Sequence, residues 1–219
     1  IRILLKKFEI KDKSLLGLYG VFSYDFIRLF EDIPENTPEN DVDDFTLFLY
    51  DTFIFFDHLK QKSEIIVFRK NTKEAENSIK EIAKKINGGM TKNISYKITN
   101  PKFSLNQKEY EKMVRLAKEY TRKGELFEVV FSNILKAKFD GDPFALYLKY
   151  RDYNPSPYLF YFDLGKEQLV GASPEMMVRC ENGIVSLRPI SGTARRGEDP
   201  IEDHENMLAL LSDPKERAE

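Results

Sequence analysis

Three segments of the sequence contain residues whose types and spacing could support chemistry. In the first, residues 171–175, Glu175 follows a proline at a kink between two apolar stretches. We expect this carboxylate at the end of a sheet and partly shielded from water. Desolvation raises the pKa of a carboxyl group, which suits a general acid. The alternative is a glutamate on an ordinary surface turn.

The second segment, residues 189–197, combines two glycines, two hydroxyl side chains and two arginines after an apolar stretch. Backbone N–H groups made accessible by glycine, together with arginine side chains, can bind a carboxylate or a phosphate. The segment is not a P-loop, because no Gly-Lys-Ser/Thr sequence ends it. An ordinary solvated loop is the alternative.

The third segment contains Glu216 and Glu219, which follow Asp213 and Pro214. Residues three apart on a helix share a face, so the two carboxylates could bind one hard cation such as Mg²⁺. The alternative is a helix start in which Glu216 completes a capping box with Asp213.

The first half of the chain is expected to form strands at residues 18–24, 45–56 and 63–69, which are rich in aromatic and β-branched residues. Apolar residues at helical spacing predict a helix over 72–87, which Gly88 and Gly89 end. Asn106 and Glu109 form a capping-box pattern before a second helix that ends at Gly124. Residues 88–106 have no strong periodicity.

The second half alternates strands and helices. A strand is predicted over 126–135 and a helix from Asp142 through about Tyr153. Four short strands follow, over residues 158–164, 168–172, 176–180 and 184–189. Asn182-Gly183 marks a hairpin between the last two. Residues 201–211 and the segment after Asp213 are predicted to be helical. Helices alternating with antiparallel hairpins predict the α+β class.

Composition narrows the function further. The chain has 219 residues, of which 42% are hydrophobic, and a net charge of −2, so it has no basic face for nucleic acid. Its longest strongly apolar run, residues 53–56, is too short to span a membrane. One cysteine, Cys180, excludes an internal disulfide and favours a cytoplasmic location. The chain begins at Ile1 instead of Met and ends inside a helical pattern, so we expect a fragment.

Six motifs in the second half resemble the chorismate-utilising enzymes, above all the large subunit (component I) of anthranilate synthase. They are Gly-Glu-Leu-Phe-Glu-Val-Val (124–130), Gly-Asp-Pro-Phe-Ala-Leu-Tyr (141–147), Asn-Pro-Ser-Pro-Tyr-Leu-Phe-Tyr (154–161), Gly-Ala-Ser-Pro-Glu-Met (171–176), Arg-Pro-Ile-Ser-Gly-Thr (188–193) and Asp-Pro-Lys-Glu-Arg-Ala-Glu (213–219). The resemblance implies two packed, largely antiparallel β-sheets with outer helices, incomplete here. It further implies an N-terminal subdomain, 1–105, and the first part of a chorismate-binding domain, 106–219.

The resemblance also assigns roles to individual residues. Glu175 matches the general acid that helps the C4 hydroxyl of chorismate leave as ammonia adds at C2. Glu216 and Glu219 match the first carboxylate pair around Mg²⁺. Thr193 matches a catalytic position, and Gly192 lies beside it in the loop next to the substrate.

Two positions indicate the branch of the family. Where isochorismate and salicylate formers carry a water-activating lysine, this chain has Glu128, a substrate-site position that argues against water as the nucleophile. Where many aminodeoxychorismate synthases carry a nucleophilic lysine, it has Ser191, which favours anthranilate synthase.

The resemblance implies one regulator and one partner. A segment that helps to bind tryptophan, the feedback inhibitor, matches Asn154, Pro155, Ser156, Pro157, Tyr158 and Leu159. Ammonia would come from a glutamine amidotransferase subunit. Two alternatives stay open: aminodeoxychorismate synthase component I of the folate pathway, and a truncated chain that binds without catalysing. The family's later catalytic motifs are absent, so we expect this chain alone to be inactive.

Overall fold

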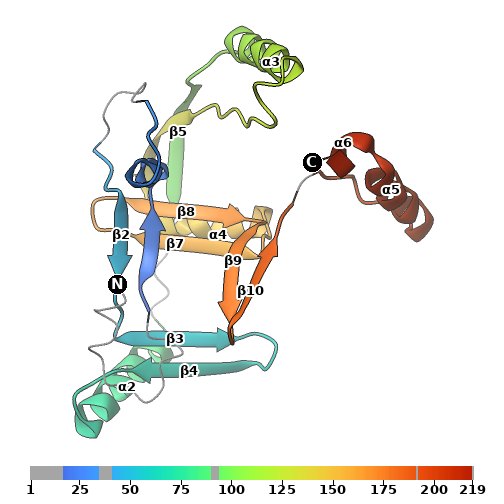
Figure 1. Ribbon diagram of the computed structural model, residues 1–219. Coiled ribbons are helices and arrows are strands. Elements are labelled where there is room, and N and C mark those ends of the chain that lie inside the picture. Colours follow the sequence, from blue (N-terminus) through green and yellow to red (C-terminus); the bar gives the residue numbers. More distant parts are fainter. Residues whose placement is uncertain (1–16, 35–40, 90–93, 191, 219) are drawn as a thin grey trace. The chain divides into compact units, whose positions relative to one another are not determined.

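The computed structural model describes residues 17–34, 41–89, 94–190 and 192–218, which form two compact units (Figure 1). The first unit contains the described residues up to Ile94 together with Leu164–Glu167, and the second contains Ser95–Asp163 and Gln168–Glu219. The domain boundary predicted at residue 105 from the sequence stays a prediction.

The first unit begins with an antiparallel pair of strands. Strand β1 (Tyr19–Phe22) pairs with β2 (Phe45–Phe48), and the 3₁₀ helix η1 (Tyr24–Leu29) follows β1. The Phe26 ring lies 4.9 Å from the Phe22 ring and 5.8 Å from the Phe45 ring, so aromatic contacts hold η1 against the pair.

A second hairpin of this unit joins β3 (Thr52–Asp57) to β4 (Lys62–Val67). The strand predicted over 45–56 is therefore two strands, interrupted at residues 49–51. Arg69 stabilises this interruption by donating hydrogen bonds to the Asp51 carbonyl at 3.2 Å and to Thr52 Oγ1 at 3.0 Å. Helix α2 (Thr72–Asn87) has the predicted bounds, and Asn71 caps it by accepting from the Glu74 N–H at 3.0 Å.

The second unit begins with β5 (Tyr96–Phe103), helix α3 (Gln107–Arg122) and β6 (Leu135–Gly141), and β5 pairs with β6. The predicted capping box is confirmed, because the Glu109 N–H donates to Asn106 Oδ1 and the Asn106 N–H donates to Glu109 Oε2. Gly124, at φ 78°, follows the end of α3 as predicted.

The strand predicted over residues 126–135 is wrong, because residues 126–134 form no strand and β6 starts at Leu135. The β-branched and aromatic composition of this segment suits a strand, but a strand also needs a pairing partner. Side chains hold the segment instead. Asn133 accepts from the Leu105 N–H at 3.0 Å and donates to the Leu105 carbonyl at 2.9 Å.

Helix α4 (Pro143–Tyr153) packs against the hairpin formed by β7 (Tyr158–Asp163) and β8 (Gln168–Ser173). Asp142 caps α4 by accepting from the Phe144 N–H at 2.9 Å. The Phe144 ring lies 5.4 Å from the Tyr161 ring, edge to face. This contact is part of the desolvated environment that raises the pKa of Tyr161.

The chain continues with the hairpin of β9 (Met176–Glu181) and β10 (Ile184–Arg188), helix α5 (Pro200–Ser212) and helix α6 (Pro214–Ala218). Asn182 and Gly183 both have positive φ, 51° and 79°, as the predicted two-residue turn requires. The Asp199 side chain accepts from the N–H groups of Ile201 and Glu202 and so caps α5.

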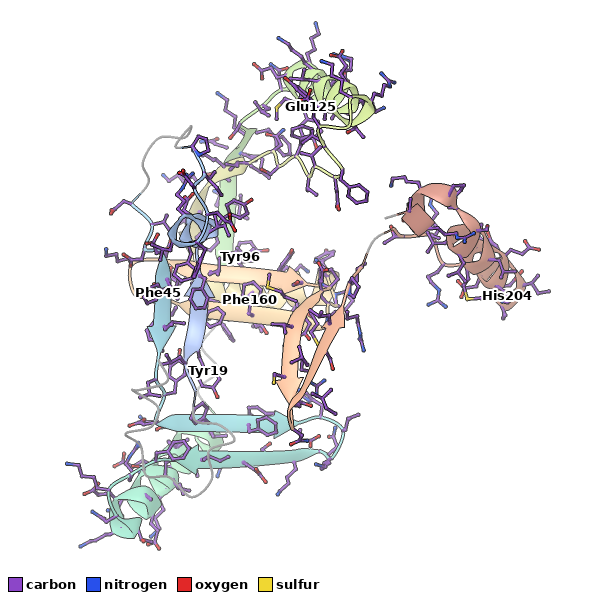
Figure 2. All side chains as sticks on the ribbon, in the orientation of Figure 1. Tyr19, Phe45, Tyr96, Glu125, Phe160 and His204 are labelled. Atoms are coloured by element: carbon purple, nitrogen blue, oxygen red, sulfur yellow. The ribbon has the colours of Figure 1, made fainter. Side chains whose placement is uncertain are left out.

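The described strands form five two-stranded antiparallel sheets, which together with the helices confirm the α+β class. Among the described residues only two apolar residues, Ala117 and Ala145, are buried, each with 8% of its surface exposed. Large apolar side chains are correspondingly exposed, and Figure 2 draws the side chains of the described residues as sticks. None of the helices in the described part of the chain combines the length and the apolar character needed to cross a bilayer.

Candidate functional site

The β9–β10 hairpin brings Glu175 close to the beginning of the 188–193 motif. Met176 pairs with Arg188 in the hairpin, so Glu175 and Pro189 lie just beyond the same end. Glu175, Arg188 and Pro189 line one pocket of about 470 Å³. The segments 171–175 and 189–197, which the sequence singled out, therefore meet at one end of the β9–β10 hairpin.

Glu175 itself is exposed, so the expected shielding from water is wrong for this structure. Its backbone N–H donates to Ser173 Oγ at 3.3 Å, which fixes the turn but leaves the carboxylate outside. β8 and β9 belong to different two-stranded sheets, and none of the described strands pairs across the corner between them. The role of Glu175 as general acid stays a prediction.

The structure brings Gly192 and Glu216 together. A Cβ atom at Gly192 would overlap the Glu216 carboxylate, so glycine leaves room for this side chain in its present position. The Glu216 side chain is 18% exposed and forms an ion pair with Lys215 at 3.3 Å. The loop that contains Gly192 and the helix that contains Glu216, predicted separately, are thus in contact. Ser191 and Glu219 lie outside the described residues.

The alternative in which Glu216 completes a capping box with Asp213 is met only in part. Asp213 accepts hydrogen bonds from the N–H groups of Lys215 at 2.8 Å and Glu216 at 3.2 Å, which is half of a capping box. The Asp213 N–H donates to the Leu210 carbonyl. The Glu216 carboxylate, which would complete the box, lies against Gly192 instead.

Sequence reasoning missed an ion pair that holds the end of the same loop. Arg196 donates from Nε and Nη2 to the two Asp203 carboxylate oxygens at 2.7 and 2.6 Å, and Gly197 N–H donates to Asp203 Oδ1 at 2.8 Å. These donors lower the pKa of Asp203 to about 2. The partners are seven residues apart across a turn, a spacing that neither helical nor strand periodicity singles out.

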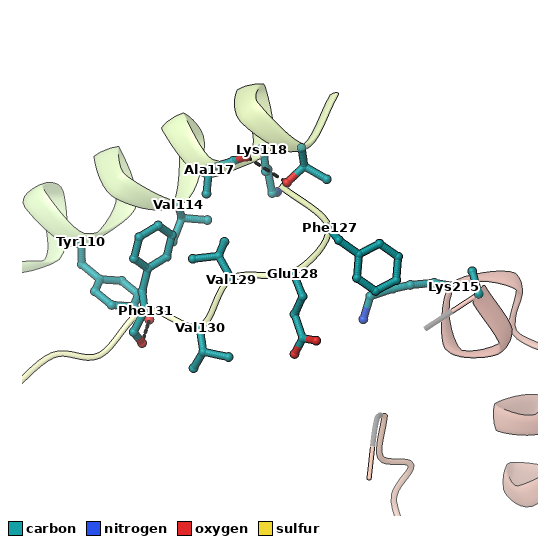
Figure 3. A pocket seen from close by; sticks show the side chains of 12 residues that line it. Tyr110, Val114, Ala117, Lys118, Phe127, Glu128, Val129, Val130, Phe131 and Lys215 are labelled. Carbon is teal, nitrogen blue, oxygen red and sulfur yellow. Dashed lines mark hydrogen bonds between the residues drawn. The ribbon is translucent and has the colours of Figure 1, made fainter. Parts of the chain in front are cut away.

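Glu128 lies on a pocket of about 620 Å³ between α3 and the segment 127–131 (Figure 3). The α3 side of the pocket includes the apolar Val114 and Ala117 together with Lys118 and Thr121, and Lys215 and Ala218 of α6 also line it. Glu128 therefore lies near the helix that contains Glu216. Thr193 is exposed.

The predicted tryptophan segment joins α4 to β7. At the end of α4 the Asn154 N–H donates a hydrogen bond to the Tyr150 carbonyl at 2.9 Å. Ser156 Oγ donates to Asn154 Oδ1 at 3.1 Å. Tyr158 is 44% exposed and Leu159 is half-buried at the start of β7. The Pro155 and Pro157 side chains are exposed, so the segment presents an accessible surface with apolar components.

The Glu216 carboxylate is chemically suited to Mg²⁺. Mg²⁺ prefers hard oxygen ligands and is commonly held by one or two carboxylates together with water and substrate oxygens. Within residues 17–34, 41–89, 94–190 and 192–218 no three His, Cys, Asp or Glu side chains gather as a metal cluster.

Comparison with known proteins identifies the family. The profile of the family described as chorismate binding enzyme matches residues 4–219. Anthranilate synthase component 1 of Aquifex aeolicus is 35% identical over 216 residues, and that of Acetivibrio thermocellus is 38% identical over 221 residues. Each alignment covers 93% of this chain and 44% of the relative.

A solved structure agrees with this result. Anthranilate synthase component I from Streptococcus pneumoniae matches 99% of this chain and 51% of its own chain, with a TM-score of 0.82 and 29% identity. The chain belongs to the chorismate binding enzyme family. It spans less than half the length of the curated relatives it matches.

Proposed function

We propose that this chain is part of the large subunit of an anthranilate synthase, which converts chorismate and ammonia to anthranilate and pyruvate. The observation that carries the proposal is that predicted segments meet: Glu175 lines one pocket with Arg188 at the start of the 188–193 motif, and Gly192 lies against Glu216. The names of the relatives and of the solved structure support the same reaction.

In the proposed mechanism Glu175 donates a proton to the C4 hydroxyl of chorismate, which leaves as water while ammonia forms a bond to C2. A bound substrate that excludes water from the pocket favours the neutral carboxyl, the form that can donate this proton. Elimination of the enolpyruvyl side chain as pyruvate then gives the aromatic ring. Gly192 and Thr193 lie beside the substrate and orient it.

Glu216 and Glu219 would hold Mg²⁺ next to the substrate carboxylate. When bound, the metal acts as a Lewis acid that draws charge toward that carboxylate. Gly192 contributes by leaving the space that the Glu216 side chain occupies. Lys215, paired with Glu216, restrains the position of the carboxylate.

The proposal extends to partners and regulation. A glutamine amidotransferase subunit would supply ammonia, and tryptophan would bind at residues 154–159 as feedback inhibitor. The accessible proline and tyrosine surfaces of that segment suit contact with an indole ring. The proposed location is the cytoplasm.

The proposal is tested by incubating the full-length gene product with chorismate, Mg²⁺ and ammonium and identifying the products by chromatography. Anthranilate with pyruvate supports it. Aminodeoxychorismate without pyruvate would assign the protein to the folate branch instead. No conversion under conditions in which the protein is folded would favour a non-catalytic binding chain.

A further inference from the structure

Helix α5 contacts the loop of residues 192–197, which contains Gly192 and Thr193, at two positions about one turn apart. Asp203 binds Arg196 through both carboxylate oxygens and accepts from the Gly197 N–H. The Asn206 side chain donates to the Arg195 carbonyl at 3.2 Å. Because residues 203 and 206 share a face of the helix, the backbone of 195–197 is bound along that face.

The contact at Gly197 is close. A Cβ atom there would overlap the backbone of Glu202 and Asp203, so the loop lies directly on the first turn of α5. The other end of the loop is fixed by the pairing of Arg188 with Met176 in the β9–β10 hairpin. The segment between these two anchors is short and contains Gly192 and Thr193.

We propose that Asp203 is a positioning residue for substrate binding, which sets the place of Gly192 and Thr193 through Arg196 and Gly197. Asn206 supports the same arrangement from the next turn of the helix. The inference rests on the proposed function, because it takes residues 192–193 to lie beside the substrate. Asp203 contacts neither substrate nor metal in this account.

The role differs from a general contribution to folding. The Arg196 side chain is 89% exposed, and exposed ion pairs contribute little to the stability of a protein. Loss of the pair should therefore leave the fold intact and release the loop locally. A released loop binds substrate less well, because its ordering then has to accompany binding.

The test compares the variants Asp203→Asn, Asp203→Glu and Glu181→Gln of the full-length protein. Glu181→Gln is a matched control, since Glu181 also binds an exposed arginine, Arg179, through both oxygens at 2.7 and 2.6 Å but lies on the β9–β10 hairpin. Hydrogen exchange of a peptide covering residues 190–199 reports on the loop. Steady-state kinetics with chorismate report on substrate binding.

We expect Asp203→Asn to speed exchange in this peptide about threefold to tenfold and to raise KM for chorismate by a similar factor, with kcat within about twofold. Asp203→Glu should restore part of both effects, and Glu181→Gln should resemble the wild type. Exchange or KM in Asp203→Asn that matches the control would overturn the positioning role. A folded wild type that forms no anthranilate would overturn the proposed function instead, while the exchange comparison still decides whether α5 holds the loop.

Discussion

Replacing Gly192 with alanine should weaken Mg²⁺ binding far more than it weakens folding. The added methyl group would overlap the Glu216 carboxylate, so either the loop or this side chain must move. The Glu216 carboxylate is the end of a flexible side chain and can yield by changing rotamer.

The expected loss of stability is much smaller than the expected loss of Mg²⁺ affinity. An off-rotamer side chain costs roughly 0.5–1.5 kcal/mol, which corresponds to a fall in Tm of at most a few degrees, and to less in a longer protein. Displacing a metal ligand or its support typically lowers metal affinity about 10- to 100-fold. We therefore expect a small loss of thermal stability together with a large rise in the Mg²⁺ concentration needed for activity.

The assay is a Mg²⁺ titration of anthranilate formation by the full-length protein, paired with thermal unfolding. Gly17→Ala serves as the control, because among the described residues a Cβ atom at Gly17 comes no nearer than 4.0 Å to any neighbour, the Tyr19 ring. An unchanged Mg²⁺ requirement in Gly192→Ala would refute the assignment of Glu216 as a ligand. A fall in Tm that accounts for the whole loss of activity would refute the separation of the two effects.

Four further outcomes are expected. Asn106→Ala should lower the free energy of unfolding by about 1 kcal/mol in chemical denaturation, because it removes the side chain that caps α3, and an unchanged value would contradict the capping box. The Asp203 carboxyl has a pKa of about 2 in the folded chain against 3.8 ordinarily, so its stabilising effect is complete above the ordinary pKa and disappears as the pH falls through 2. Because the pair is exposed, this effect is small: unfolding measured across pH 2–5 should lose a small part of its pH dependence in Asp203→Asn, and identical profiles would contradict this. Glu175→Gln should reduce kcat for anthranilate about 10²- to 10⁴-fold, and a rate near that of the wild type would exclude Glu175 as the general acid. The 219-residue chain alone should form no detectable anthranilate, and turnover by it would contradict this expectation. It should also associate with increasing concentration in sedimentation velocity, because many large apolar side chains of the described residues are exposed; a strictly monomeric state would contradict this.

Local signals in the sequence predicted much of the fold. The capping residues of α3 and α4, the glycine after α3 and the Asn182-Gly183 turn act through neighbouring backbone groups, so short sequence patterns suffice to find them. The α+β class followed from the same elements. Strand pairing depends on partners distant in sequence, and this is why the strand predicted over 126–135 was wrong.

The candidate site was predictable in its residue types but not in its contacts. The resemblance to the family named Glu175, Gly192 and Glu216, yet only the structure shows Gly192 against Glu216. The shielding of Glu175 could not be judged from sequence, because it depends on whether another strand covers the corner after β8. Asp203 has no local signature, since its partner lies across a turn.

The most direct test of the account is a crystal structure of the full-length protein with chorismate and Mg²⁺. We expect one bound chorismate, with the Glu175 carboxyl at hydrogen-bonding distance from its C4 hydroxyl. We expect the Glu216 carboxylate at or next to the metal that binds the ring carboxylate. Chorismate bound elsewhere, or a metal held without either Glu216 or Glu219, would contradict the proposed site.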